Sequence, residues 1–256
     1  MDHPSPDDHD QTGQETKPFL EHLEDLRSTL IGCITALVVG MCVAFPLAPY
    51  LLRWLKRPLL RVTDKPDEFL RTLDVTGAFM LSMQIAFWGG LILSAPFLTY
   101  FLARFISPGL TARERELVRR SLGLAGGLFF FGVALGYFAA LPVAMEVMFG
   151  MNKWMGIRAE WTITSYVAFA TQLLLGFGLV FEFPLVLLVL GRLGIINSGQ
   201  LRRARKFVII IILVVAAFIT PGPDIFSQLI MAAPMYVLYE ICIWMLRVSE
   251  RSQRSA

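Results

Sequence analysis

The chain has 256 residues, of which 55% are apolar and 17% are charged, and its formal net charge is +3. Soluble proteins carry about 25% charged residues, so this composition excludes the soluble globular and disordered classes. So small a net charge also argues against a polyanionic partner such as a nucleic acid. The composition therefore predicts a membrane protein.

The N-terminal region divides into two parts. Residues 1–16 are polar and acidic, and we expect them to form a disordered tail rather than a cleavable signal peptide. Beyond them, apolar residues recur at helical spacing, at Phe19, Leu23, Leu26 and Leu30. This pattern predicts an amphipathic helix that lies on the cytoplasmic surface of the membrane and leads into the first span.

Six apolar runs follow, each free of charge or interrupted by a single glutamate. They cover residues 28–52, 75–103, 121–145, 161–191, 207–223 and 225–246. About 20 apolar residues cross a bilayer as a helix, and a helix satisfies its backbone polar groups within one segment. We therefore predict an all-α polytopic membrane protein with six transmembrane helices. They form one domain, residues 17–247, which a tail follows, residues 248–256.

Prolines and turns shape these spans. Outside the turn at residues 220–224, five of the six spans contain proline, including Pro96, and Pro58 follows the first span closely. Because proline kinks a helix, we expect the helices to pack into a concave bundle. A tight turn, in which Asp224 caps the final helix, joins the last two spans into a hairpin. The charge-free lengths of these spans, 17 residues and, before Glu240, 15 residues, cover about 25 and 23 Å at about 1.5 Å per residue. Both are below the roughly 30 Å hydrocarbon layer, so we expect the bilayer to thin around them.

The distribution of lysine and arginine predicts the orientation. With six spans, both termini lie on the same side of the membrane. That side holds 15 of the 23 basic residues, whereas the other side holds eight, six of them between Arg53 and Arg71. Because basic loops stay in the cytoplasm, we predict that both termini are cytoplasmic.

The chain lacks the residues that most catalytic chemistry needs. All three histidines, His3, His9 and His22, precede the first span. The sequence contains no metal-ligand spacing, no phosphate-binding loop and no nucleophile motif. It therefore predicts neither an enzyme nor a bound cofactor, and it favours a protein that acts by binding and by shape.

Glu182 is an acid inside the fourth span. An ionised carboxylate there costs roughly 2.5–3.5 kcal/mol, and Pro184 frees a backbone carbonyl one turn earlier. A water-lined polar pocket that matters in transport is one interpretation, and a protonated glutamate hydrogen-bonded to a neighbouring helix is the other. Glu240, in the last span, is expected to reach toward the cytoplasmic interface near Arg247.

Two further acids, Asp25 and Glu114, lie among basic residues on the predicted cytoplasmic side. Asp25 could simply favour the N-terminal part of a helix. Glu114 could complete a capping box with Thr111. From spacing alone, these structural roles are favoured over a binding role.

Several motifs occur in a fixed order along residues 18–247. They are Phe19-Leu-Glu-His22-Leu-Glu-Asp25-Leu-Arg27, Leu93-Ser-Ala-Pro96, Phe105-Ile-Ser-Pro108-Gly-Leu110 with Glu114-Arg115, Phe181-Glu182-x-Pro184, Thr220-Pro221 with Pro223-Asp224-x-Phe226-Ser227-Gln228, and Pro234-Met235-Tyr236 with Glu240. Together they resemble TatC, the six-span core subunit family of the twin-arginine protein translocase. Asp25 replaces the glutamate usual in that family and so shortens the reach of the carboxylate by one methylene.

The resemblance implies a receptor for the twin-arginine signal peptides of folded cargo proteins. The implied binding residues are Asp25, Glu114, Arg27, Phe105 and Leu110. The chemistry agrees with this role, because guanidinium groups form bidentate, charge-assisted hydrogen bonds with carboxylates. The basic surroundings would repel other cationic segments and so sharpen selection.

The resemblance also implies partners. Single-span TatA and TatB subunits would pack on the last two spans, where Thr220 and Gln228 would supply polar contacts unless they only mark a hydrated helix end. It further implies self-association in a multi-copy complex in the bacterial inner membrane, with transport driven by the proton-motive force.

A small-molecule transporter coupled to protons or ions and centred on Glu182 is the alternative hypothesis. Such a transporter would show an internal repeat with a second acid at matching depth, and Glu182 and Glu240 do not match in this way.

Overall fold

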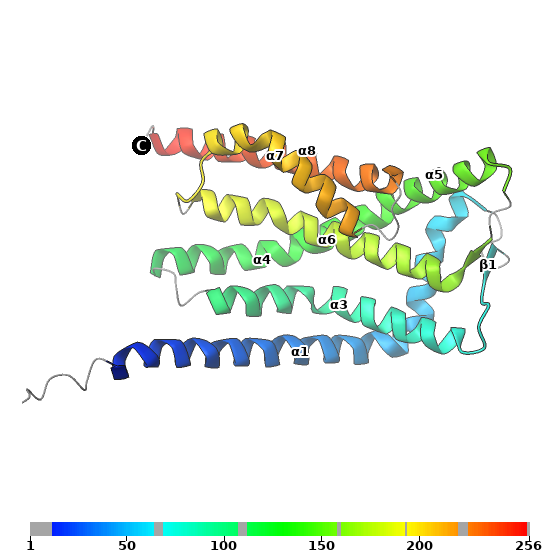
Figure 1. Cartoon of the computed structure of the whole chain (residues 1–256), viewed down its shortest axis with the longest axis horizontal. Coiled ribbons are helices and arrows are strands. Elements are labelled where there is room, and N and C mark those ends of the chain that lie inside the picture. The colour runs from blue at the N-terminus through cyan, green and yellow to red at the C-terminus, as the bar shows by residue number, and fades with distance from the viewer. Residues whose placement is uncertain are drawn as a thin grey trace, which may run out of the picture.

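The computed structural model describes residues 12–63, 69–106, 112–157, 160–192, 194–219 and 225–254 (Figure 1). The α-helices are α1 (Thr12–Lys56), α3 (Gly77–Ile106), α4 (Ala112–Leu135), α5 (Leu141–Trp154), α6 (Ile163–Arg192), α7 (Ser198–Ile219) and α8 (Ile225–Arg254). The short elements are the 3-10 helix η2 (Arg57–Arg61), the π-helix η4 (Gly136–Ala140), and the strands β1 (Leu70–Arg71) and β2 (Trp161–Thr162).

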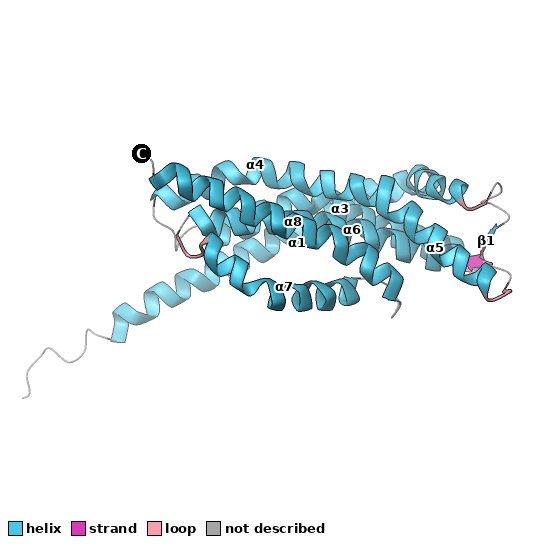
Figure 2. Ribbon diagram, turned by 90° about the horizontal axis from the view of Figure 1, so that it is seen from above, coloured by secondary structure: helices cyan, strands magenta, loops and turns pink. Residues whose placement is uncertain are grey.

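The helices run along the long axis of the molecule (Figures 1 and 2). One end, which we call the basic end, contains the start of α1, the end of α3, the start of α4, the start of α7 and the end of α8 (Figure 1). The opposite end, the far end, contains β1 and the C-terminal part of α5 (Figure 1). The all-α polytopic architecture predicted from the sequence is confirmed.

Five helical stretches of the described chain are long and apolar enough to cross a bilayer. They cover residues 23–61, 77–105, 121–154, 163–191 and 228–248. The predicted fifth span corresponds to α7, whose first turns carry Arg202, Arg203, Arg205 and Lys206. Its apolar part, residues 207–219, covers only about 20 Å at about 1.5 Å per residue. Accordingly, α7 ends and α8 begins well short of the far end (Figure 1).

The amphipathic segment at the start of the chain differs from its prediction. It was expected to lie on the membrane surface, but α1 continues unbroken for 45 residues and so joins this segment to the first span. Leu23 and Leu30 are exposed on its side. α1 begins at Thr12, inside the stretch assigned to a disordered tail, whereas residues 1–11 lie outside the described chain. The structural reason is that no proline or glycine lies between Leu23 and Ile31 to interrupt the helix.

A short strand pair at the far end was not predicted. β1 and β2 run parallel, with Leu70 opposite Trp161 and Arg71 opposite Thr162. The ring of Phe69 packs edge-on against Trp161, with 4.9 Å between the ring centroids. Two residues per strand are too few to produce a visible alternation in the sequence, so tertiary packing determines this pair.

Close helix packing occurs where glycine faces a neighbouring backbone. A Cβ atom at Gly40 of α1 would lie 2.6 Å from the carbonyl oxygen of Gly90 in α3. A Cβ atom at Gly132 of α4 would lie 2.6 Å from the carbonyl oxygen of Phe177 in α6. By contrast, a Cβ atom at Gly127 would meet nothing within 4 Å. Only some of the glycines in the third span therefore serve helix packing.

Two described prolines mark the boundaries of helical elements, whereas a third stays inside a helix. Pro58 lies at the start of the 3-10 helix η2 and is buried. Pro142 lies at the start of α5, directly after the π-helical turn η4, because it cannot supply the N–H that an α-helix would need there. Pro96 remains inside α3, where it packs 3.3 Å from the position of a Cβ atom at Gly126 in α4.

Candidate binding site

A polar pocket of about 540 Å³ opens at the basic end, between the start of α1, the end of α3 and the start of α4. It is lined by Asp25, Ser28, Thr29, Tyr100, Phe101, Arg104, Phe105, Arg115, Val118, Arg119 and Leu122. Asp25 and Phe105, two residues proposed from the sequence, are thus brought together although 80 positions separate them. An exposed carboxylate and a half-buried aromatic ring share one site.

The other residues proposed for this site are placed differently. Arg27 is exposed on α1 and does not line the pocket. Glu114 belongs to the first turn of α4, but its side chain lies outside the described part of the structure. Leu110 also lies outside the described residues. The structure therefore assembles Asp25 with Phe105 and leaves the position of the second carboxylate open.

Three arginines of the pocket were not proposed from the sequence. Arg104 comes from the last turn of α3, and Arg115 and Arg119 come from the first turns of α4. Arg119 forms an ion pair of 2.8 Å with Glu116 one turn earlier. Within the described chain, neither Arg104 nor Arg115 forms an ion pair, so the pocket carries excess positive charge beside Asp25. Helical spacing could have placed Arg115 and Arg119 on one face, but only the packing of α3 against α4 adds Arg104.

Glu182 lies on α6, about 15 Å from its end at the basic end of the bundle, at about 1.5 Å per residue. The residue is half-buried, and its Oε1 atom is buried without a hydrogen-bond partner among the described residues. Leu179 and Phe183 beside it are exposed. A hydrogen bond to a neighbouring helix, one of the two interpretations of Glu182, is thus not seen for this oxygen among the described residues. Glu182 also lies far from the polar pocket along the bundle axis.

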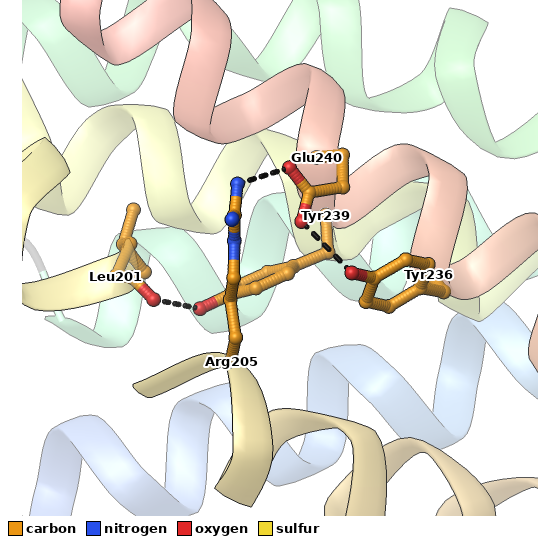
Figure 3. Close-up of polar contacts among 5 residues, drawn as sticks. All are labelled: Leu201, Arg205, Tyr236, Tyr239 and Glu240. Carbon is orange, nitrogen blue, oxygen red and sulfur yellow. Dashed lines mark hydrogen bonds and ion pairs between the residues drawn. The ribbon is translucent and has the colours of Figure 1, made fainter. Parts of the chain in front are cut away.

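A polar network joins α7 to α8 (Figure 3). The Nη2 atom of Arg205 donates to Oε2 of Glu240 at 2.7 Å, and the Tyr236 hydroxyl donates to Oε1 of the same carboxylate at 3.0 Å. The hydroxyl of Tyr239, which is fully buried, donates to the carbonyl of Leu201 at 2.7 Å. Glu240 was expected to reach toward the cytoplasmic interface near Arg247, and the structure adds an ion-pair partner that the sequence did not name. Its partner is Arg205, because the hairpin folds the basic first half of α7 against α8.

The hairpin also holds Gln228, for which a partner-helix contact was proposed. Its Nε2 atom donates to the carbonyl of Leu213 at 2.8 Å, so this amide already binds within the chain. Thr220 and Asp224 lie outside the described residues. In the ranges that the structure describes, no group of three His, Cys, Asp or Glu residues could hold a metal ion.

The fold and the site define a helical membrane protein with a polar pocket at one end. The Sec-independent protein translocase protein (TatC) family model matches residues 21–234. The chain belongs to the TatC family.

Individual relatives agree with this assignment. A TatC protein of Carboxydothermus hydrogenoformans is 36% identical over 234 residues, which are 90% of this chain and 93% of that protein. One of Akkermansia muciniphila is 40% identical over 176 residues, which are 69% of this chain. The matched region spans about half, 51%, of that longer relative.

Solved structures allow the fold itself to be compared. A crystal structure of the twin-arginine translocase receptor TatC superposes with a TM-score of 0.77 at 33% sequence identity. The match covers 90% of this chain and 99% of the crystallised chain. Family membership makes the chain a non-enzymatic component of a protein translocase, and it does not favour the small-molecule transporter.

Proposed function

We propose that this chain is the receptor and organising scaffold of a twin-arginine translocase. In this role it binds the twin-arginine signal peptides of folded proteins at the basic end, and it organises TatA and TatB subunits for export driven by the proton-motive force. The observation that carries the proposal is the joint placement of Asp25 and Phe105 in one pocket. The crystallised relative with the same fold is described as a receptor.

The carboxylate of Asp25 suits a guanidinium ligand. Charge-assisted hydrogen bonds between the two are short and roughly twice as strong as neutral ones. The half-buried ring of Phe105 offers an apolar surface beside that carboxylate. Glu114, in the first turn of α4, would add the second carboxylate, and Leu110 would add a further apolar contact. Arg27 stands on the same helix as Asp25 but outside the pocket.

The pocket arginines support selection of the ligand. Arg104 and Arg115 repel cationic peptides. A peptide with an isolated basic residue forms no strong pair with a carboxylate to offset this repulsion, so its binding is disfavoured. A twin-arginine peptide can offset this repulsion through bidentate contacts. A lysine side chain offers only a point charge and cannot form the same pair of parallel hydrogen bonds with a carboxylate.

The partner helices are proposed to bind to the α7–α8 hairpin. Its short apolar length would place a single-span helix beside a thinned bilayer. Phe207, Ile211 and Phe218 of α7 are exposed on its surface. Gln228 and Thr220 would supply the polar contacts, although Gln228 would then have to share or exchange its bond with Leu213. The chain would reside in the bacterial inner membrane, with both termini cytoplasmic, and self-associate in a multi-copy complex.

Binding of a fluorescent twin-arginine signal peptide to the full-length protein in detergent tests the receptor role. The Asp25→Asn and Glu114→Gln variants should each weaken binding by about tenfold or more, since a hydrogen bond to a charged group contributes roughly 1.5–3 kcal/mol. Glu24→Gln is the matched control, because Glu24 is an exposed acid next to Asp25 that does not line the pocket. Unchanged binding in the Asp25, Glu114 double variant would contradict the proposal.

A further inference from the structure

A second cavity adjoins the polar pocket. It is an open groove of about 530 Å³ between α1 and α3, and we call it the α1–α3 groove. Its lining residues are Gly32, Thr35, Ala36, Val39, Gly40, Val43, Leu93, Ser94, Phe97 and Phe101. Phe101 lines both cavities, so the polar pocket leads directly into the groove.

The walls of the groove are apolar even where polar residues line it. The Thr35 hydroxyl donates to the carbonyl of Ile31 at 2.7 Å, and the Ser94 hydroxyl donates to that of Leu91 at 3.1 Å. Both hydroxyls are therefore engaged by their own helices. Val39 and Phe97 are 57% and 60% exposed, so the groove presents a hydrocarbon surface to whatever fills it.

The depth of the groove matches one leaflet of a bilayer. Its residues on α1 run from Gly32 to Val43, which is about 16 Å at about 1.5 Å per residue. Half of the roughly 30 Å hydrocarbon layer is about 15 Å. The groove begins at the basic end and stops near mid-membrane, whereas a transmembrane partner helix would need a groove about twice as long.

The polar pocket, into which the groove opens, contains groups that bind phosphate. Arg104 and Arg115 have no ion-pair partner in the described chain, and Arg119 stands beside them in the polar pocket. Ser28 and Thr29 add hydroxyl groups from α1. Arginine forms bidentate hydrogen bonds with phosphate, and basic pockets between membrane helices bind anionic lipid head groups.

We propose that the polar pocket and the α1–α3 groove together bind one anionic phospholipid. Its phosphate lies among Arg104, Arg115 and Arg119, and one acyl chain follows the groove toward mid-membrane. Two independent observations converge on this occupant: excess positive charge at the head-group level, and an apolar channel that is one leaflet deep and continuous with it through Phe101.

If the chain is the proposed receptor, the lipid site has a consequence for peptide binding. Only this consequence rests on the proposed function. The lipid and the signal peptide would share the polar pocket and compete for it. The lipid depends on the pocket arginines, while the peptide depends on Asp25. Replacing an arginine should therefore weaken lipid binding, and replacing Asp25 should weaken peptide binding. In each case the binding of the other ligand should stay the same or become stronger, so the two proposals can fail separately.

Native mass spectrometry of the full-length protein in detergent tests the lipid site. The probes are phosphatidylglycerol and phosphatidylcholine with identical acyl chains, added together in equal amounts. We expect one tightly held phosphatidylglycerol. The Arg104→Gln and Arg115→Gln variants should each weaken its binding about fivefold, since a basic residue near an anionic lipid contributes about 1 kcal/mol. Arg202→Gln and Arg203→Gln, exposed on α7 at the same end, should change nothing.

Two further experiments test whether the acyl chain lies in the groove, and neither depends on the arginines. Ala36→Trp should fill the groove and reduce lipid retention, whereas Val38→Trp, at a 51% exposed position outside the groove, should not. Phosphatidylglycerol with a photoactivatable acyl chain should label Val39, Val43 and Phe97 more strongly than the exposed face of α7.

Four outcomes of the lipid experiments would overturn the proposal. They are equal binding of the two lipids, an unchanged preference in the arginine variants, even labelling of all lipid-facing surfaces, and displacement of the lipid by an equal concentration of inorganic phosphate. Crosslinking of the signal peptide to Val39 or Val43 in the presence of phosphatidylglycerol would also overturn it, by showing that a peptide occupies the groove. Weaker peptide binding in Asp25→Asn with unchanged lipid binding would support both assignments.

Discussion

The hydroxyl group of Tyr137 donates a 2.7 Å hydrogen bond to the backbone carbonyl of Trp54, 83 positions earlier in the chain. Pro58 explains why this carbonyl is available, because proline has no N–H to donate to the residue four positions before it. The carbonyl of the next residue, Leu55, is bonded by the hydroxyl of Tyr166. Tyr137 thus compensates for the N–H that Pro58 lacks, and Tyr166 binds the neighbouring carbonyl at the end of α1.

Removing the Tyr137 hydroxyl should reveal this compensation. Tyr137→Phe is expected to lower the free energy of unfolding by about 1 kcal/mol, the usual net contribution of one hydrogen bond. In a Pro58→Ala background the cost should shrink, because residue 58 regains its N–H. Denaturant titration in detergent micelles, followed by circular dichroism, measures both values. Equal costs in the two backgrounds would disprove the link between Pro58 and Tyr137.

The ion pair between Arg205 and Glu240 should hold α7 against α8. Arg205→Met leaves an unpaired carboxylate in the last span, and because the two side chains are 42% and 32% exposed we expect a loss of about 1–2 kcal/mol. The Arg205→Met, Glu240→Met double variant should lose less than the Arg205→Met single variant. Chemical unfolding of the purified variants checks this order, and additive losses would contradict it.

Gly132 should tolerate no side chain. In Gly132→Ala, the new Cβ would lie 2.6 Å from the carbonyl oxygen of Phe177, so α4 and α6 must separate at a cost of about 1–3 kcal/mol. Gly127→Ala is the matched control on the same helix, where a Cβ meets nothing within 4 Å, and it should be neutral or stabilising by up to about 1 kcal/mol. Thermal unfolding of both variants provides the test. Similar destabilisation by both would argue against the proposed packing.

Glu182 should matter for transport rather than for stability. Its buried Oε1 atom has no partner among the described residues, so Glu182→Leu removes no hydrogen bond from this atom and should not lower the free energy of unfolding. Export of a twin-arginine reporter protein should nevertheless fall if a carboxyl group is needed inside the membrane. Glu182→Gln tests whether polarity alone suffices. Normal export by Glu182→Leu would remove Glu182 from the mechanism.

Local patterns in the chain predicted the spans well, because lipid requires long apolar helices and these are visible as runs of residues. The same reasoning failed for the surface helix before residue 31, since nothing in a helical pattern says whether it bends at the interface or continues, as α1 does. It also did not name the partner of Glu240. Only the hairpin brings Arg205 within 2.7 Å of this carboxylate.

The sequence by itself determined the number and type of the membrane helices, the shortness of the fifth span, and the motifs by which the family can be recognised. Only the tertiary structure decided which of the few charges meet. Asp25 joins Phe105 and three arginines in one pocket because α1, α3 and α4 converge at the basic end. The physical reason is that hydropathy acts residue by residue along the chain, whereas charges and hydroxyl groups act over a few ångströms between segments that only packing brings together.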